Sequence, residues 1–274
     1  MFKCIFMYEF EKFWSKKINL MCFLSIPVIV LLSLKFALET NTQAKVTDVV
    51  FSSSMNFPII SIQEMLLTAS NIIVLIFFVL SFNEEYRKGN LKMAFSRAIS
   101  IKKLYLAKFL VLAINIFLIL IIHFIISFIV GEFYLPKVSK TALFLKEGLY
   151  DAKYAAIYTL KYYFVGYLSL LAFGSIVQFF SIKCNTITAT LGLSIGTFFV
   201  NFLYIEIVLS LFGSCKNSLT VLKYLCISTV YAQFSGAANF AAGITSVFLL
   251  GMFIVIAIFQ ITSYLSFINE DYLE

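Results

Sequence analysis

The stretch "FNEEYRKGNLKMAFSRAISIKKLYLAK", residues 82–108, decides the fold because it separates two runs of almost pure hydrocarbon. The run before it is "MLLTASNIIVLIFFVLSF" (65–82), and the run after it is "FLVLAINIFLILIIHFIISFIV" (109–130). A helix needs about 20 apolar residues to cross the hydrocarbon core of a bilayer. The charged stretch is therefore predicted to connect two membrane spans.

The composition of the whole chain leads to the same class of protein. Its 274 residues are 61% hydrophobic and 13% charged, whereas soluble domains are near half apolar and about a quarter charged. The net charge of +7 comes from basic residues that flank apolar runs and form no compact patch. We therefore expect membrane lipid as a partner, and no nucleic acid.

Apolar runs of spanning length recur along the chain, so we predict an all-α polytopic membrane protein with six transmembrane helices. An interfacial helix at 1–17 precedes them, and the segment 213–240 is too polar to span cleanly. The predicted spans are 18–38, 65–82, 105–130, 162–180, 187–212 and 241–268.

Basic residues beside the spans predict the orientation. The N-terminal tail, the 82–108 stretch and the turn at Lys183 carry more of them than the short connections on the other side. The positive-inside rule then places both termini in the cytoplasm. A composition rich in Lys, Ile and Phe with only two Arg is typical of an AT-rich bacterial genome, so we expect a bacterial cell membrane.

The long connection after the third span, on the opposite side, would either gate the outer exit or lie on the lipid surface. Its apolar residues have helix-like spacing. They are Leu143, Leu145, Leu149 and Tyr150.

Within the 82–108 stretch, four residues at i, i+3, i+4 and i+7 form one apolar stripe, which predicts a short basic amphipathic helix. This helix would be either a lipid anchor or a docking surface for a cytoplasmic partner. Glu84 and Glu85 favour docking, because acidic residues gain nothing at an anionic membrane surface. The stripe consists of Leu91, Ala94, Phe95 and Ala98.

The same stretch resembles the permease subunits of type-2 ABC exporters. In that family a Glu-x-x-x-Gly-Thr segment leads through an apolar turn to an Arg-Pro-x-Ser-Arg element and to a Lys that opens the third span. Asn90, Ala98 and Ile101 stand where Thr, Pro and the second Arg are common. The matching residues are Glu85, Gly89, Leu91, Phe95, Arg97, Ser100 and Lys108.

The resemblance implies that 84–103 is a coupling helix that docks on a separate ATPase, that 1–17 is an elbow helix, and that 213–240 is an outer re-entrant hairpin. It implies ATPase-coupling roles for Glu84, Glu85, Arg87, Gly89, Leu91, Phe95 and Arg97.

No G-x-x-x-x-G-K-[ST] phosphate-binding loop occurs in the chain, so ATP and Mg would be held by the partner. We expect no cofactor and no catalysis in this chain. The expected assembly contains two ATPase copies and a second permease copy, as a homodimer or a heterodimer.

Polar and ionisable residues inside spans are candidates for a substrate pathway, and here these are His123, Gln178 and Glu206. His123 and Glu206 would either bond to one another, line a wet vestibule, or reach water separately. Gly192 and Gly196 form a G-x-x-x-G, which permits close helix approach within the chain or in a dimer. The family resemblance favours the dimer.

Two other classes of membrane protein compete with this interpretation. A secondary transporter or channel tends to show inverted repeats and broken helices, and neither is visible in the sequence. An intramembrane hydrolase needs groups that activate water, but the single histidine and five cysteines form no metal-binding pattern, and "EEYRKG" departs from a Glu-Glu-x-x-x-Arg motif. We therefore predict ATP-driven export of an amphipathic substrate, either a peptide such as an antimicrobial peptide or a lipid-like molecule.

Overall fold

The structure, a computed structural model, describes residues 2–87, 100–184, 186–212 and 218–269, with the backbone alone for 84–87 and 218–220. Within these residues, six helices are long and apolar enough to cross a membrane. This result confirms the prediction of a helical polytopic membrane protein.

The elements follow one another along the chain as a series of long helices interrupted by short ones. The first half contains α1 (Phe2–Ser15), α2 (Lys17–Asn41), α3 (Phe57–Met65), the π-helical η1 (Leu66–Ser70), α4 (Asn71–Arg87) and α6 (Ile101–Tyr134). The second half contains β1 (Thr141–Ala142), β2 (Leu149–Tyr150), α7 (Ala152–Lys183), α8 (Ile187–Phe212), α9 (Ser218–Leu225), α10 (Thr229–Tyr231), the π-helical η2 (Ala232–Gly236), α11 (Ala237–Ala241) and α12 (Val247–Ile268).

The second candidate span is longer than the apolar run that predicted it. It is the continuous helix α3–η1–α4, which begins at Phe57 rather than at Met65. Pro58 stands in its first turn, where the fixed φ of proline suits a helix start. Gln63 and Glu64 interrupt the apolar pattern of the sequence, and the predicted start of the second span lies directly after them, at Met65.

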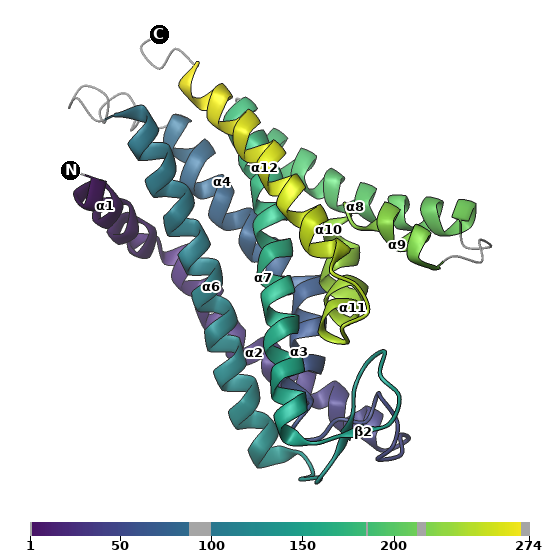
Figure 1. Cartoon of the computed structure of the whole chain (residues 1–274). Coiled ribbons are helices and arrows are strands. Elements are labelled where there is room, and N and C mark those ends of the chain that lie inside the picture. Colours follow the sequence, from purple (N-terminus) through teal and green to yellow (C-terminus); the bar gives the residue numbers. More distant parts are fainter. Residues whose placement is uncertain (1, 88–99, 185, 213–217, 270–274) are drawn as a thin grey trace.

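Helix α7 forms the centre of the bundle. In its most apolar 18-residue window 78% of the residues are buried, compared with 6% for α8. Helices α4 and α12 pack along α7, and α6 packs against α1, α2 and α3 (Figure 1). A Cβ at Gly174 would lie 2.4 Å from the Phe78 ring, so this glycine allows α4 to approach α7 closely. Helix α8 diverges from the others, as Figure 1 shows.

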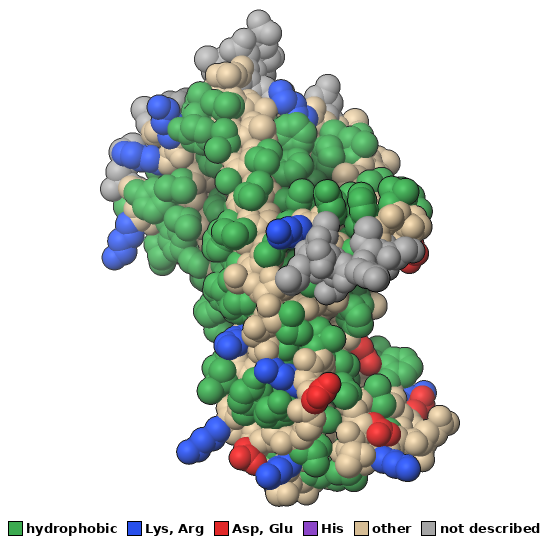
Figure 2. Space-filling view, turned by 45° about the vertical axis from the view of Figure 1, so that its right-hand side comes forward, with side chains coloured by type: hydrophobic (Ala, Val, Ile, Leu, Met, Phe, Trp, Pro, Cys, Tyr) green, Lys and Arg blue, Asp and Glu red, His purple; other side chains and the backbone are tan. Residues whose placement is uncertain are grey.

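The end of the bundle opposite α1 carries side chains of both charges. Helix α1 and the end of α12 lie in the upper part of Figure 1, and the β1–β2 hairpin lies at the opposite end. Helix α6 has 34 residues, about 50 Å at 1.5 Å per residue, so it exceeds a hydrocarbon core of ~30 Å. Its excess length and the hairpin form a cap, on which Figure 2 shows Lys, Asp and Glu side chains mixed together.

The connection between α6 and α7 contains a β-hairpin and no helix, despite the helix-like spacing of its apolar residues. Thr141 pairs with Tyr150 in an antiparallel ladder. Leu145 has a φ of 58° and Gly148 a φ of 93°, a left-handed conformation that ends any right-handed helix. The residues with this spacing form no common buried face, because Leu143 is 1% exposed whereas Leu145 and Leu149 are 53% and 42% exposed.

The described part of the segment between α8 and α12 contains α9, α10, η2 and α11, which lie beside the longer helices α7, α8 and α12. Gly243, with a φ of 77°, separates α11 from α12 as a left-handed residue after a helix end. Helix α12 therefore begins at Val247 and not at residue 241. At Gly251 a Cβ would lie 2.1 Å from the carbonyl oxygen of Cys226, so only glycine fits there without a shift.

We expect Gly251→Ala to lower the free energy of unfolding by about 1–3 kcal/mol, because the added methyl group overpacks the contact with Cys226. The measurement is thermal unfolding of the purified chain in detergent. Gly192→Ala is the matched control, since no described atom outside its own helix backbone lies within 4 Å of a Cβ at that position. Equal stability of the two variants would contradict this packing.

Candidate functional site

The connection between α4 and α6 is the segment for which the sequence predicted a docking role. Glu84, Glu85 and Arg87 belong to the last turns of α4. The other four predicted coupling residues, Gly89, Leu91, Phe95 and Arg97, lie outside the described residues. The structure therefore defines how the two ends of this connection are held, and these ends form the candidate site.

Asn83 fixes the end of α4, directly before the two predicted coupling glutamates. Its side-chain amide donates hydrogen bonds to the carbonyl oxygens of Cys184 at 2.7 Å and Ser181 at 3.3 Å. It also lies 3.1 Å from the hydroxyl oxygen of Thr190, and Asn83 itself is fully buried. The end of α4 is thus linked to the turn between α7 and α8.

Lys108 fixes the beginning of α6. Its Nζ lies 2.8 Å from Oε2 of Glu9 on α1, and the two side chains are only 1% and 7% exposed. Lys108 also donates to the carbonyl oxygen of Ser81, and Lys16 donates to that of Leu80 at 2.6 Å. Buried charges are stable only when they are paired and hydrogen-bonded. These contacts therefore hold α1 against both α4 and α6.

Tyr105, one turn before Lys108, links α6 to α12. Its hydroxyl donates to Oε1 of Gln260 at 2.8 Å. The amide nitrogen of Gln260 donates in turn to Oε1 of Gln178 at 2.8 Å and to the hydroxyl of Ser175 at 3.0 Å, both on α7. Gln178, predicted to line a substrate pathway, is fully buried and contributes here to a junction of three helices.

His123 lies in a second buried junction. Its Nδ1 is 2.8 Å from the hydroxyl of Tyr163 on α7, and its Nε2 is 3.0 Å from the hydroxyl of Ser61 on α3. Glu206 lies on the exposed surface of α8. The structure therefore brings His123 together with Ser61 and Tyr163, and does not pair it with Glu206.

Gly192 and Gly196 face away from the rest of the described chain, since no described atom outside their own helix backbone lies within 4 Å of a Cβ at either position. Packing within the chain, one of the two roles considered for this G-x-x-x-G, is therefore absent from the described structure. The face that carries them belongs to α8, the least buried of the six spans.

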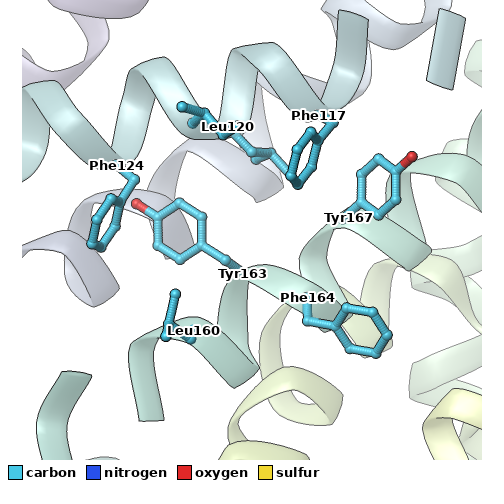
Figure 3. Close-up of a pocket in the computed structure, with 8 residues that line it drawn as sticks. Phe117, Leu120, Phe124, Leu160, Tyr163, Phe164 and Tyr167 are labelled. Atoms are coloured by element: carbon cyan, nitrogen blue, oxygen red, sulfur yellow. The ribbon is translucent and has the colours of Figure 1, made fainter. Parts of the chain in front are cut away.

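An aromatic groove of about 290 Å³ opens between α6 and α7. Figure 3 shows residues of α6 facing residues of α7 across it. The hydroxyl of Tyr163 bonds His123, and that of Tyr167 donates to the carbonyl oxygen of Ala113. Both polar groups are used within the protein, so the groove offers hydrocarbon contact only. Its lining includes Phe117, Leu120, Phe124, Leu160, Tyr163, Phe164 and Tyr167.

The buried interhelical contacts of four residues were not predicted from the sequence. These residues are Glu9, Asn83, Tyr105 and Gln260. Glu9 falls on the same helical face as Ile5 and Phe13, and this isolated acidic residue on an apolar face was the available signal. Gln260 is a polar residue inside the last span, a position that by itself suggests a buried partner.

We expect Glu9→Gln to lower the free energy of unfolding by about 1.5–3 kcal/mol, the usual worth of a hydrogen bond to a charged group. Glu11→Gln is the matched control on the exposed side of the same helix, with an expected change within about 0.5 kcal/mol. Unfolding in detergent is measured for Glu9→Gln, Lys108→Met and the double variant. If the two effects simply add, the pair is not energetically coupled.

Comparison with known proteins assigns the chain to a family. No curated protein matches the sequence. A family model described as a protein of unknown function (DUF2705) matches residues 47–273. This match covers most of the chain, from the connection before α3 to beyond the end of α12. The chain therefore belongs to the DUF2705 family.

Proposed function

We propose that the chain is the membrane-spanning permease subunit of an ATP-driven ABC exporter, in which a separate ATPase binds the 84–103 segment. The observation that carries this proposal is the way both ends of that segment are held. Asn83 links one end to the α7–α8 turn, Lys108 links the other to α1, and Tyr105 links it to α12. A force applied to the segment would reach the cytoplasmic half of the bundle through buried contacts.

The proposed mechanism is mechanical. Two ATPase subunits close on ATP and pull on two such segments, one in each permease copy, and the helices respond by rigid-body movement. Helix α1 acts as the elbow in this scheme. Lys16, in an extended conformation between α1 and α2, breaks the helix there, and Glu9 ties α1 to the root of α6.

Two further features support the proposal. The face of α8 with Gly192 and Gly196 is open for a second copy of the permease. The segment 213–240, with α9 to α11 among its described residues, is apolar yet contains no spanning helix there, as expected for an outer re-entrant hairpin. The abundant apolar and aromatic surface suits an amphipathic substrate better than a sugar, which needs many hydrogen-bonding partners.

A secondary transporter is the second candidate, and one observation favours it. The π-helical segments η1 and η2 face one another through Asn71 and Gln233, whose side-chain amides exchange two hydrogen bonds of 2.9 Å. Irregular helices that meet inside the membrane are typical of secondary transporters. Such a protein would need no ATPase.

We expect the tagged chain, purified gently from its native membrane, to bring a P-loop ATPase with it in equal amount. The double variant Glu85→Ala/Arg97→Ala should lose the ATPase, because both changes fall in the proposed docking segment. Mass spectrometry of the purified material measures the ratio.

The matched control is Glu132→Ala/Lys137→Ala, which removes an ion pair from the cap at the opposite end. This variant should keep the ATPase. A wild-type chain that emerges alone or only with itself would overturn the exporter proposal and favour the secondary transporter.

We expect Gly192→Leu to weaken a permease dimer in detergent by about tenfold or more, because leucine prevents close approach of two α8 helices. Light scattering over a dilution series measures the dimer fraction. Ala257→Leu, on the exposed face of α12, makes a similar increase in size elsewhere and should leave the dimer intact. An unchanged dimer in both variants would place the interface on another helix.

A further inference from the structure

A second pocket of about 290 Å³ lies at the outer ends of α2 and α3. Unlike the groove between α6 and α7, it has a mixed lining. Val50 and Phe144 from the cap connections give it apolar walls. Its polar groups are Thr40, Ser52, Gln63 and Glu64.

Glu64 supplies the only carboxylate of this pocket. The side chain is partly buried and interacts with the hydroxyl of Ser33 on α2. No ion pair involves Glu64 in the part of the chain that the structure describes, and the neighbouring Lys35 pairs with Glu39 at 3.8 Å. A carboxylate withdrawn from water gains most from a cation that enters beside it.

Ser52 supplies a second polar group. Its backbone N–H donates to Oδ1 of Asn41, and its carbonyl oxygen accepts from Nδ2 of Asn41, both at 2.7 Å. These two bonds fix the residue, which is 1% exposed. Its hydroxyl oxygen is buried and has no hydrogen-bond partner among the described residues. A primary ammonium has three N–H donors and no acceptor, so it complements Glu64 and Ser52 together.

The level of the pocket in the membrane indicates what kind of molecule would carry the ammonium group. Glu64 lies seven residues after Phe57, about 10 Å along a helix. The spanning helix of 27 residues is about 40 Å long, roughly 10 Å more than the hydrocarbon core. With Asn83 at the inner boundary, Glu64 lies at the outer boundary, at the level of lipid headgroups. A ligand that enters from the bilayer meets the carboxylate with its head and the apolar wall with its chain.

We propose that this pocket binds the primary ammonium group of an amphiphile, with the adjoining alkyl chain against Val50 and Phe144. A lysine side chain of an amphipathic peptide and the headgroup of phosphatidylethanolamine share this chemistry. The site rests on its own contacts and needs neither ATP nor an ATPase. Its test is therefore independent of the exporter proposal.

The experiment uses the purified full chain in phosphatidylcholine nanodiscs and an octylamine probe with a photoreactive diazirine in its alkyl chain. Mass spectrometry locates the labelled peptides. We expect labelling within residues 37–67 that unlabelled octylamine suppresses, and much weaker labelling by the matching diazirine octanol. Equal labelling by amine and alcohol, or no suppression by octylamine, would overturn the proposal.

Variants of the same chain identify the group that recognises the amine. Glu64→Gln should weaken labelling about tenfold, equivalent to about 1.4 kcal/mol, while Glu64→Asp and Ser52→Ala should give intermediate losses. Glu11→Gln, which removes an exposed glutamate on α1, is the control and should label as the wild type does. Unchanged labelling of Glu64→Gln at an unchanged melting temperature would exclude Glu64 as the anion. Should Glu64→Gln fail to fold, Ser52→Ala provides the same comparison.

A final arm distinguishes the two sources of the amine. Nanodiscs that contain phosphatidylethanolamine should suppress labelling if the lipid headgroup occupies the site. An added amphipathic leucine–lysine peptide should suppress labelling if a peptide side chain does. Suppression by either source supports an ammonium site.

Discussion

The buried ion pair between Lys108 and Glu9 is the interaction on which the end of the bundle that contains α1 depends. An ammonium group near the beginning of a membrane helix is costly to bury, and a carboxylate 2.8 Å away offsets much of this cost. Because the two charges belong to α6 and α1, the N-terminal helix is held to the bundle by an ion pair as well as by apolar packing. The contacts of Lys108 and Lys16 with backbone carbonyls of α4 extend the same junction. The helix ends that flank the 84–103 segment are therefore held together by buried polar contacts.

Polar side chains inside the spans follow the same logic at other levels. A polar group in hydrocarbon is costly unless it finds a partner, and two of the three predicted pathway residues bond to side chains on other helices. His123 bonds Tyr163 and Ser61, and Gln178 bonds Gln260. These two residues therefore link helices to one another, whereas Glu206 lies on the exposed surface of α8. The polar lining of the second pocket lies at the opposite end of the bundle, beside α2 and α3.

The sequence predicted the helical class and the number of candidate spans, because length and hydropathy alone specify them. It failed where local geometry overrides the apolar pattern. The left-handed conformations of Leu145 and Gly148 produce a hairpin at apolar positions with helix-like spacing. The first turns of the second span were not predicted, because the carboxylate of Glu64 interrupts the apolar run and suggests the end of a span. Glu9 was missed because its partner lies 99 residues away along the chain, and no periodicity reports such a pairing.

Helix α8 is the span that packs least against the rest of the described chain. Only 6% of its most apolar window is buried, although α7 beside it is 78% buried. Lipid can cover any apolar surface, so exposure alone requires no protein partner. A glycine pair adds a different argument, because glycine costs helix stability relative to alanine and here provides close approach to no other described helix. The two glycines therefore serve no packing within the described chain, which supports the proposed contact with a second copy, where small residues permit close approach.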